Sequence, residues 1–243
     1  MVQKKMLKKQ TAVAVFVKTP SISEVKTRLA KVIGQSRAID FYLRSVRVIQ
    51  KKLQFLEASL DIKPYWAVAE PEGLSSWETF PAVLQGNGGL GERLFQVQEM
   101  LFKDHDRVIF IGGDCPQIQT RQIEKAHESL RSGTDAIFIP AEDGGYALFG
   151  FTRPLLKETW TEVRYSSDKT LKEFTQALRK EDLDPIFFTQ TFDIDDFKSL
   201  VQLKEKLDTE YAKDEILRDQ MDSYFSDASE LFSNSNSRLH SNS

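Results

Sequence analysis

The sequence predicts an α/β protein of three layers, in which helices cover both faces of a mostly parallel sheet. Short apolar runs alternate with longer amphipathic stretches over most of the 243 residues. A sheet whose strands are joined by helices on both faces gives this alternation, because each strand is buried on both sides. Hydrophobic residues make up 40% and charged residues 28%, which is typical of a soluble globular chain.

The first elements are a strand, a polar loop and a helix. Ala12–Val17 is a short run rich in β-branched residues and predicts a buried strand. Between residues 36 and 56, apolar residues recur at steps of three and four, which predicts an amphipathic helix. Next in the chain we expect a strand at Tyr65–Ala69, a helix at Gly91–Phe102 and a strand at Arg107–Ile111.

The second half of the chain continues the alternation. Thr120 is a candidate N-cap and Gly133 a candidate C-cap of one helix. The other expected elements are strands at Ala136–Ile139, Ala147–Phe151 and Ile186–Phe192, and helices at Asp168–Arg179 and Asp195–Leu217.

One domain accounts for most of the chain. We assign residues 11–225 to it, since no second hydrophobic block and no internal repeat is present. Residues 1–10 form a basic extension before it. Residues 226–243 are dominated by Ser and Asn and predict a disordered tail.

Charge and cysteine content exclude several classes of function. The net charge of −3 gives no general attraction to nucleic acid or to an anionic membrane surface. A single Cys and three scattered His argue against a disulfide framework and a zinc site. The apolar run at Ala12–Val17 is too short for a signal peptide, and no segment reaches the roughly 20 residues of a membrane span. We expect a cytoplasmic protein.

The loop after the first strand is a candidate phosphate site. It carries Lys18, Lys26 and Arg28, with the hydroxyl of Thr27 as a further donor. Cations and free backbone N–H groups near a helix start bind phosphate. Because Lys26 and Arg28 lie two residues apart, they would project to the same side of an extended loop. A solvated basic loop is the alternative, and no P-loop or dinucleotide-binding glycine motif is present.

A glycine-rich segment, QGNGGLGER at residues 85–93, precedes the second helix. Glycines such as Gly91 let a backbone approach a ligand closely. A tight strand-to-helix turn would use glycine in the same way, and Arg93 could be an ordinary surface residue.

Aspartates at two strand ends are candidate metal ligands. Asp114 follows an apolar strand and two glycines, a position suited to Mg²⁺, which takes one or two carboxylates and completes its shell with substrate phosphates. Helix capping is the alternative for Asp114. Asp193 and Asp195 alternate at another strand end, so one of them could be a second ligand, although a helix N-terminus would also favour aspartate there.

The acidic turn PAEDGGYA at residues 140–147 could contact a substrate. Glu142 and Asp143 could bind a substrate hydroxyl or act as a base, while Gly144 and Gly145 allow close approach. A simple Asp-Gly turn is the other interpretation.

Taken in order, these segments resemble a known family. The chain resembles the GT-A glycosyltransferase-like proteins, also called selenium-domain-associated transferases, from about Ala12 to Leu200. The motifs that carry the resemblance are VFVKTP, KTRL, GGLGER, IGGDCP, PAEDGGY and DID. One departure is Tyr165-Ser166-Ser167, where family members usually have Trp-Ser-Thr.

The resemblance implies a nucleotide-diphospho-sugar transferase fold and roles for the motif residues. On this basis the first loop binds the nucleotide phosphates, Gly91 and Arg93 contact base or phosphate, Asp114 binds metal, and the segment from Glu142 to Tyr146 lines the acceptor side.

The expected function is metal-dependent transfer from a nucleotide-activated donor to a small-molecule acceptor, most readily of a sugar from a nucleotide diphosphate. Mg²⁺ or Mn²⁺ on Asp114 would offset the charge on the departing diphosphate, with help from Lys26 and Arg28. Asp143 is the candidate base. Nucleotidyl transfer with release of pyrophosphate is the second hypothesis, and a non-catalytic nucleotide-binding protein is the third.

Overall fold

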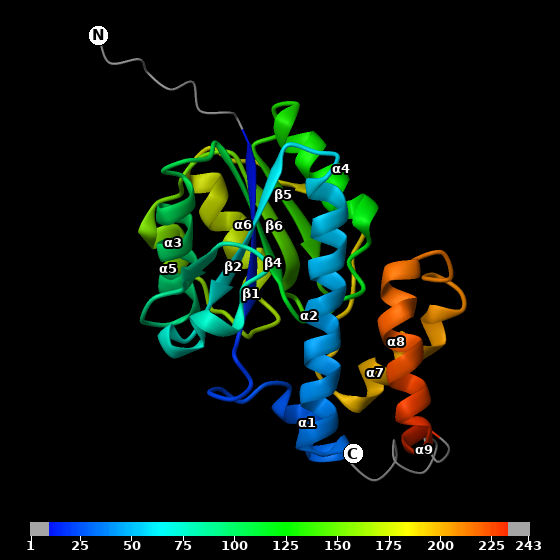
Figure 1. The fold of residues 1–243 in the computed structure, drawn as a ribbon. Coiled ribbons are helices and arrows are strands. Elements are labelled where there is room, and N and C mark those ends of the chain that lie inside the picture. Colours follow the sequence, from blue (N-terminus) through cyan, green and yellow to red (C-terminus); the bar gives the residue numbers. More distant parts are fainter. Residues whose placement is uncertain (1–9, 233–243) are drawn as a thin grey trace.

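One seven-stranded sheet forms the centre of the molecule in the computed structural model, which describes residues 10–232 (Figure 1). The strands lie in the order β3-β2-β1-β4-β6-β5-β7. Their bounds are β1 Thr11–Val17, β2 Ile62–Val68, β3 Ala82–Leu84, β4 Arg107–Gly112, β5 Ala136–Pro140, β6 Tyr146–Phe151 and β7 Ile186–Phe187. Among the strands within residues 10–232, only β6 runs antiparallel to its neighbours, β4 and β5, so the expected mostly parallel α/β sheet is confirmed.

Helices cover both faces of this sheet. The helices α2 and α4 lie on one face, and α3, α5 and α6 lie on the other (Figure 1). In chain order the helices are α1 Thr27–Ile33, α2 Gln35–Glu57, the short 3₁₀ helix η1 Pro71–Ser76, α3 Leu90–Leu101, α4 Thr120–Arg131, α5 Lys157–Thr161, α6 Thr170–Lys180, α7 Phe197–Leu207, α8 Glu215–Asp227 and α9 Ser229–Phe232. None of the helices within residues 10–232 is long and apolar enough to cross a membrane.

The central strand β1 shows why the first apolar run forms a buried strand. Val13, Val15 and Val17 point into the core under α2 and α4. Ala12 and Ala14 point into the core on the other face. Side chains alternate along a strand, so a strand between two helical layers needs apolar residues at every position.

Two helices replace the single long helix expected at Asp195–Leu217. The helix α7 ends at Leu207, and α8 begins at Glu215. Asp196 caps α7 by accepting a hydrogen bond from the Ser199 backbone N–H, and Asp214 caps α8 in the same way through Leu217. Each aspartate satisfies N–H groups at a new helix start, so the chain turns between the two helices although its apolar spacing continues.

The C-terminal boundary also differs from the prediction. The helix α8 continues to Asp227 and α9 follows at Ser229–Phe232, and Ala228 and Leu231 are buried in the core that contains α7 and α8. Their apolar side chains were too few for the composition to reveal them. The expected strand at Ile186–Phe192 is reduced to the two residues of β7. The segments 1–9 and 233–243, which hold most of the expected extension and tail, lie outside the described residues.

Candidate functional site

A cavity of about 500 Å³ opens where β1 and β4 end and β6 begins. This is the edge at which ligands bind in open parallel sheets. Its lining includes, among the residues singled out from the sequence, Lys18, Lys26, Thr27, Asp114, Asp143, Gly145, Tyr146 and Asp193. The motifs therefore come from four separate parts of the chain to one cavity.

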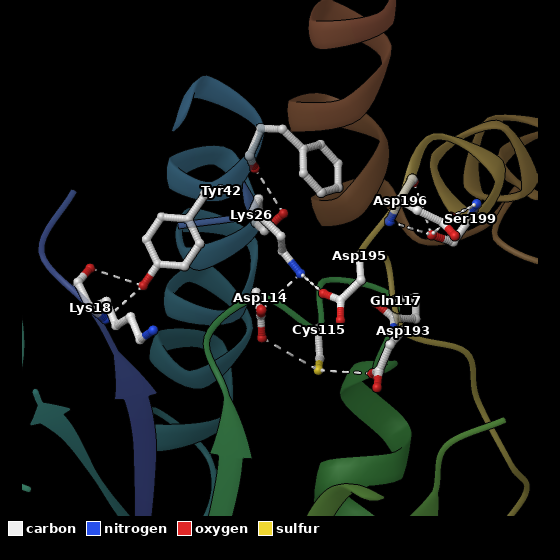
Figure 2. A network of polar contacts seen from close by, with 12 residues as sticks. Lys18, Lys26, Tyr42, Asp114, Cys115, Gln117, Asp193, Asp195, Asp196 and Ser199 are labelled. Carbon is white, nitrogen blue, oxygen red and sulfur yellow. Dashed lines mark hydrogen bonds and ion pairs between the residues drawn. The ribbon is translucent and has the colours of Figure 1, made fainter. Parts of the chain in front are cut away.

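Lys26 lies at the centre of a charged cluster in this cavity. Its ammonium Nζ is 2.8 Å from an Asp114 carboxylate oxygen and 2.9 Å from an Asp195 carboxylate oxygen (Figure 2). The Lys26 side chain is only 3% exposed. Desolvation alone would lower the pKa of Lys26, but the two carboxylates raise it above its usual value. Lys26 is therefore a fixed positive charge.

The backbone at Lys26 explains how the side chain reaches this position. Lys26 is the N-cap of α1 and has φ 48° and ψ 44°, in the left-handed region. That conformation costs about 1–2 kcal/mol for a residue other than glycine, and the two ion pairs compensate for it. The helix begins at Thr27, so the loop is not extended there. The expectation that Lys26 and Arg28 project to the same side is wrong for this reason, and Arg28 is exposed on α1 outside the cavity lining.

Asp114 comes after Gly112 and Gly113 at the end of β4, and the packing around Gly113 leaves no room for a side chain. A Cβ atom on Gly113 would lie 2.9 Å from a Val17 methyl group and 3.0 Å from the Phe16 carbonyl oxygen. Desolvation would raise the pKa of Asp114, but the Lys26 ammonium lowers it below its usual value. Asp114 is therefore ionised.

Asp193 completes the carboxylate side of the cavity. Desolvation, followed by the neighbouring carboxylates of Asp143 and Asp114, raises the pKa of Asp193 to about 7. The cluster thus holds more negative charge than Lys26 neutralises.

Within residues 10–232, no three His, Cys, Asp or Glu side chains are placed to hold a metal by themselves. The Lys26 ammonium already lies between Asp114 and Asp195. The expectation of a metal at these aspartates stays a prediction.

Cys115 is buried, with its Sγ atom 3.9 Å from a carboxylate oxygen of Asp114 and of Asp193 (Figure 2). Burial and the neighbouring carboxylates raise the pKa of this thiol well above its usual value. A protonated, buried thiol is a packing residue.

The first loop is held by contacts that the sequence did not reveal. The Lys18 backbone N–H donates to the Tyr42 hydroxyl at 2.8 Å, and this hydroxyl donates to the Lys18 carbonyl oxygen at 3.0 Å (Figure 2). The Thr19 backbone N–H donates to Glu70 at 2.9 Å. These contacts fix the backbone while the exposed Lys18 side chain stays at the cavity.

The glycine-rich segment contributes less directly than expected. A Cβ atom on Gly91 would lie 2.4 Å from the Trp160 carbonyl oxygen, so this glycine allows α3 to pack against α5. Arg93 donates to the Gly88 carbonyl oxygen at 3.0 Å, and neither Gly91 nor Arg93 is part of the cavity lining. Gln85, at the start of the segment, does line the cavity.

The acidic turn is both a turn and part of the cavity. An Asp143 carboxylate oxygen accepts a hydrogen bond of 2.9 Å from the Gly145 backbone N–H. Gly144 has φ 87°, and a Cβ atom there would lie 2.2 Å from the Asp168 carbonyl oxygen. Asp143, Gly145 and Tyr146 line the cavity, whereas Glu142 and Gly144 do not.

Sequence comparison connects the chain to one family. The family model described as "uncharacterized protein conserved in bacteria (DUF2064)" matches residues 54–167. The search of curated proteins found no match.

Solved structures confirm the fold implied by the resemblance. One is a protein of Desulfovibrio desulfuricans G20 whose name assigns it provisionally to the nucleotide-diphospho-sugar transferases. It is 25% identical with a TM-score of 0.73, over 89% of this chain and 97% of that one. The chain is therefore similar to nucleotide-diphospho-sugar transferases in fold and, more distantly, in sequence.

More distant likenesses extend to nucleotidyltransferases and concern the fold alone. A cytidylyltransferase of Leptospira borgpetersenii is 13% identical with a TM-score of 0.54, over 93% of this chain and 98% of that one. The 4-diphosphocytidyl-2C-methyl-D-erythritol synthase of Anaerococcus prevotii is 12% identical with a TM-score of 0.53, over 82% and 96%.

Proposed function

We propose that this protein is a transferase that uses a nucleotide-activated donor, and that it moves a sugar from a nucleotide diphosphate to a small-molecule acceptor. The observation that carries the proposal is the make-up of the cavity. It combines Lys18 and Lys26 at the end of β1 with the carboxylates of Asp114, Asp143 and Asp193. Such cations bind a diphosphate, and a carboxylate nearby can accept the proton of an acceptor hydroxyl. The volume of about 500 Å³ suits a small-molecule site.

A divalent cation, Mg²⁺ or Mn²⁺, fits the carboxylate side of the cavity. Burial, and then the carboxylates of Asp143, Asp114 and Asp195, raise the pKa of Asp193 to about 7. A cation would neutralise the negative charge of these carboxylates. In the proposal Asp114 holds this cation, with Asp193 or Asp195 as second ligand, and the donor phosphates complete the coordination. When bound, such a cation offsets the charge that develops on a departing diphosphate.

The chain's own residues have separate tasks in this proposal. Lys18 binds a donor phosphate from a loop that Tyr42 fixes. Lys26 places a permanent positive charge beside the leaving diphosphate. Asp143, held by the Gly145 N–H, accepts the proton of the acceptor hydroxyl.

Nucleotidyl transfer is the second candidate, favoured by the fold likeness to cytidylyltransferases. In that reaction a phosphorylated substrate attacks the α-phosphate of a nucleoside triphosphate and pyrophosphate leaves. The same two lysines would neutralise the phosphates.

A donor screen with product analysis tests the proposal. The protein is incubated with UDP-glucose, GDP-mannose, CTP or GTP and a library of acceptors, with and without Mn²⁺, and products are followed by ³¹P NMR. Release of a nucleoside diphosphate from a sugar nucleotide supports glycosyl transfer, while pyrophosphate from a triphosphate supports the second candidate. Nucleotide binding without any turnover would contradict both and favour a non-catalytic binding protein.

Asp143→Asn makes this screen specific for the site. The amide oxygen can still accept from the Gly145 N–H, so the turn is kept while the base is lost. We expect unchanged donor affinity and loss of transfer. Asp184→Asn, a change of the same kind at a carboxylate whose side chain is 82% exposed, is the matched control and should transfer normally.

A further inference from the structure

Charge is distributed unevenly along the cavity. Of the described residues that line it, only Lys18 and Lys26 carry a positive charge, and both belong to the loop after β1. In the half formed by the start of β6 and by Tyr165, Ser166, Ser167 and Thr170, none of the lining residues is a lysine or arginine. Two cations of this segment, Arg164 and Lys169, are exposed and do not line the cavity, and Arg164 pairs with Glu173.

The carboxylate of Asp143, just before β6, lines this half of the cavity, and Asp193 lies near both Asp143 and Asp114. A phosphate ester or carboxylate bound there would meet the Asp143 carboxylate, and no lysine or arginine lines this half to neutralise the added charge. Like charges in a partly desolvated site repel, and this repulsion selects against an anionic partner.

Apolar side chains form one wall of the cavity. Tyr146, Leu94 and Phe110 line this part of the cavity and belong to the core on the α3 side of the sheet. Leu90, the first residue of α3, also lines the cavity although it is 46% exposed. An exposed leucine at the mouth of a cavity offers contact area to the apolar part of a ligand.

Tyr165 adds an unused hydrogen-bonding group to this wall. Its side chain lines the cavity, and its hydroxyl is buried with no hydrogen-bond partner among the described residues. Burial, and then the charge of Glu92, raises the pKa of Tyr165, so the hydroxyl stays neutral and can donate. A buried hydroxyl without a partner costs about 1–3 kcal/mol, which a ligand oxygen would recover.

From these features, and resting on the function proposed above, we infer that the acceptor is an uncharged hydroxyl compound with an apolar face, and not a phosphate ester or a carboxylate. Its apolar face lies against Tyr146 and Leu90, and one of its oxygens accepts a hydrogen bond from the Tyr165 hydroxyl.

In the transfer step the acceptor oxygen bonds to the anomeric carbon of the donor sugar. The bond from that carbon to the diphosphate breaks, its electron pair leaves on the diphosphate, and the hydroxyl proton goes to Asp143. This assignment favours glycosyl over nucleotidyl transfer to a phosphorylated substrate.

Matched pairs of probes test the charge selectivity. Saturation-transfer NMR is recorded for neutral compounds and their phosphate esters, such as phenyl β-D-glucopyranoside and its 6-phosphate, in the presence of the tightest-binding nucleoside diphosphate. We expect the neutral member to bind at least tenfold more tightly. Equal or tighter binding of the phosphate esters, or no binding of any neutral probe, would overturn the assignment. If no nucleoside diphosphate binds, the proposed function itself fails, so the two failures are distinguishable.

Two variants test the residues named. Ser166 lines the cavity and is exposed, so Ser166→Lys adds the missing cation. We expect it to reduce the preference for the neutral probe by at least fivefold, while Ser223→Lys on the exposed side of α8 leaves the preference unchanged. An unchanged preference in Ser166→Lys would mean that missing positive charge does not set the selectivity.

Tyr165→Phe separates ligand binding from structure. Because the Tyr165 hydroxyl has no partner in the described protein, its removal should leave the melting temperature equal or higher. Affinity for the neutral probe should fall by about threefold to tenfold, the range of one hydrogen bond. Tyr65→Phe, which removes a hydroxyl bonded to His105 at 2.9 Å, is the control and should not change probe affinity. Unchanged probe affinity in Tyr165→Phe would remove Tyr165 from the acceptor site.

Discussion

The Lys26 ammonium and the Asp114 carboxylate lie 2.8 Å apart and join the loop after β1 to the end of β4. Asp195 shares the same ammonium at 2.9 Å, from a loop 169 residues further along the chain. A single buried cation therefore joins three segments of the candidate site: the loop after β1, the end of β4 and the loop that carries Asp195.

Replacement of Lys26 should destabilise the protein. Lys26→Met removes the cation and leaves Asp114, Asp193 and Asp195 to repel one another. We expect a loss of about 2 kcal/mol in the free energy of unfolding, less than the 3–5 kcal/mol of a fully buried pair, because the aspartate partners are partly exposed. Urea denaturation measures this loss.

The double variant Lys26→Met/Asp114→Asn gives the matching test, since it removes both charges and should recover part of the stability. Lys31→Met, at an exposed position of α1, serves as the control and should stay within about 0.5 kcal/mol of the unchanged protein. Additive losses in the double variant would contradict a direct ion pair.

Neutralisation of Asp114 should act on metal-dependent binding more than on folding. Asp114→Asn keeps the side-chain shape, and Lys26 retains Asp195 as a partner. We expect near-normal stability and loss of any Mn²⁺-dependent gain in UDP affinity, because the amide lacks the charge that the cation requires. Calorimetric titration of UDP with and without Mn²⁺ measures this, and an unchanged Mn²⁺ effect would remove Asp114 from the metal site.

Lys18 and Arg28 should differ in their effect on diphosphate binding. Lys18 lines the cavity, whereas Arg28 is exposed outside it. We expect Lys18→Ala to weaken UDP binding by about 1.5–3 kcal/mol, the range of a charged hydrogen bond, with little change for uridine. Arg28→Ala should change UDP affinity by no more than about 0.5 kcal/mol. Equal losses for both variants at one salt concentration would mean that α1 moves to bring Arg28 to the ligand.

The fold was predictable because its signals are local. Val13, Val15 and Val17 on one face of a strand and Ala12 and Ala14 on the other require two helical layers, and this pattern is readable in sequence. The position of the candidate site was also predictable, because glycines and aspartates follow the expected strands in the sequence.

The contacts that build the site were not predictable, because they join distant segments. Nothing in the local pattern pairs Lys26 with Asp195 or places the Tyr42 hydroxyl on Lys18. Tyr42 is a buried residue of α2, and its neighbours in sequence give no sign of a contact with the first loop. Arg28 was misplaced because the start of α1 at Thr27 depends on the left-handed Lys26, which is itself held by tertiary ion pairs.

The helical C-terminus should contribute to stability. Leu231 is 4% exposed and packs in the core shared by α1, α2, α7 and α8. We expect a chain that ends at Phe225 to melt well below a chain that ends at Phe232, and Leu231→Ala to cost about 2–3 kcal/mol. Ser223→Ala, on the exposed side of α8, is the control. Equal melting temperatures of the two truncated chains would show that residues 226–232 add no stability.

Two adjacent lysines of α2 provide the last test, because one pairs with the N-cap of α8 and the other with α8 itself, and only the first is buried. The Lys52 ammonium is fully buried and donates to the carbonyl oxygens of Pro116 at 3.0 Å and Ile118 at 2.8 Å, and to Asp214 at 2.7 Å. Burial lowers the pKa of Lys52, against the opposing effect of Asp214. Lys51, in contrast, pairs with Asp219 at 2.6 Å and is 41% exposed.

Lys52→Met should leave Asp214 and two carbonyl oxygens without their donor, at a cost of about 3–5 kcal/mol in the free energy of unfolding. Lys51→Met removes only a solvent-screened pair and should cost at most about 1 kcal/mol. Urea denaturation of the two variants compares them directly. Because Pro116 and Ile118 follow Asp114 closely in the chain, Lys52→Met should also weaken UDP binding, whereas Lys51→Met should not. Similar stability losses in the two variants would show that burial of the Lys52 ion pair does not set its contribution.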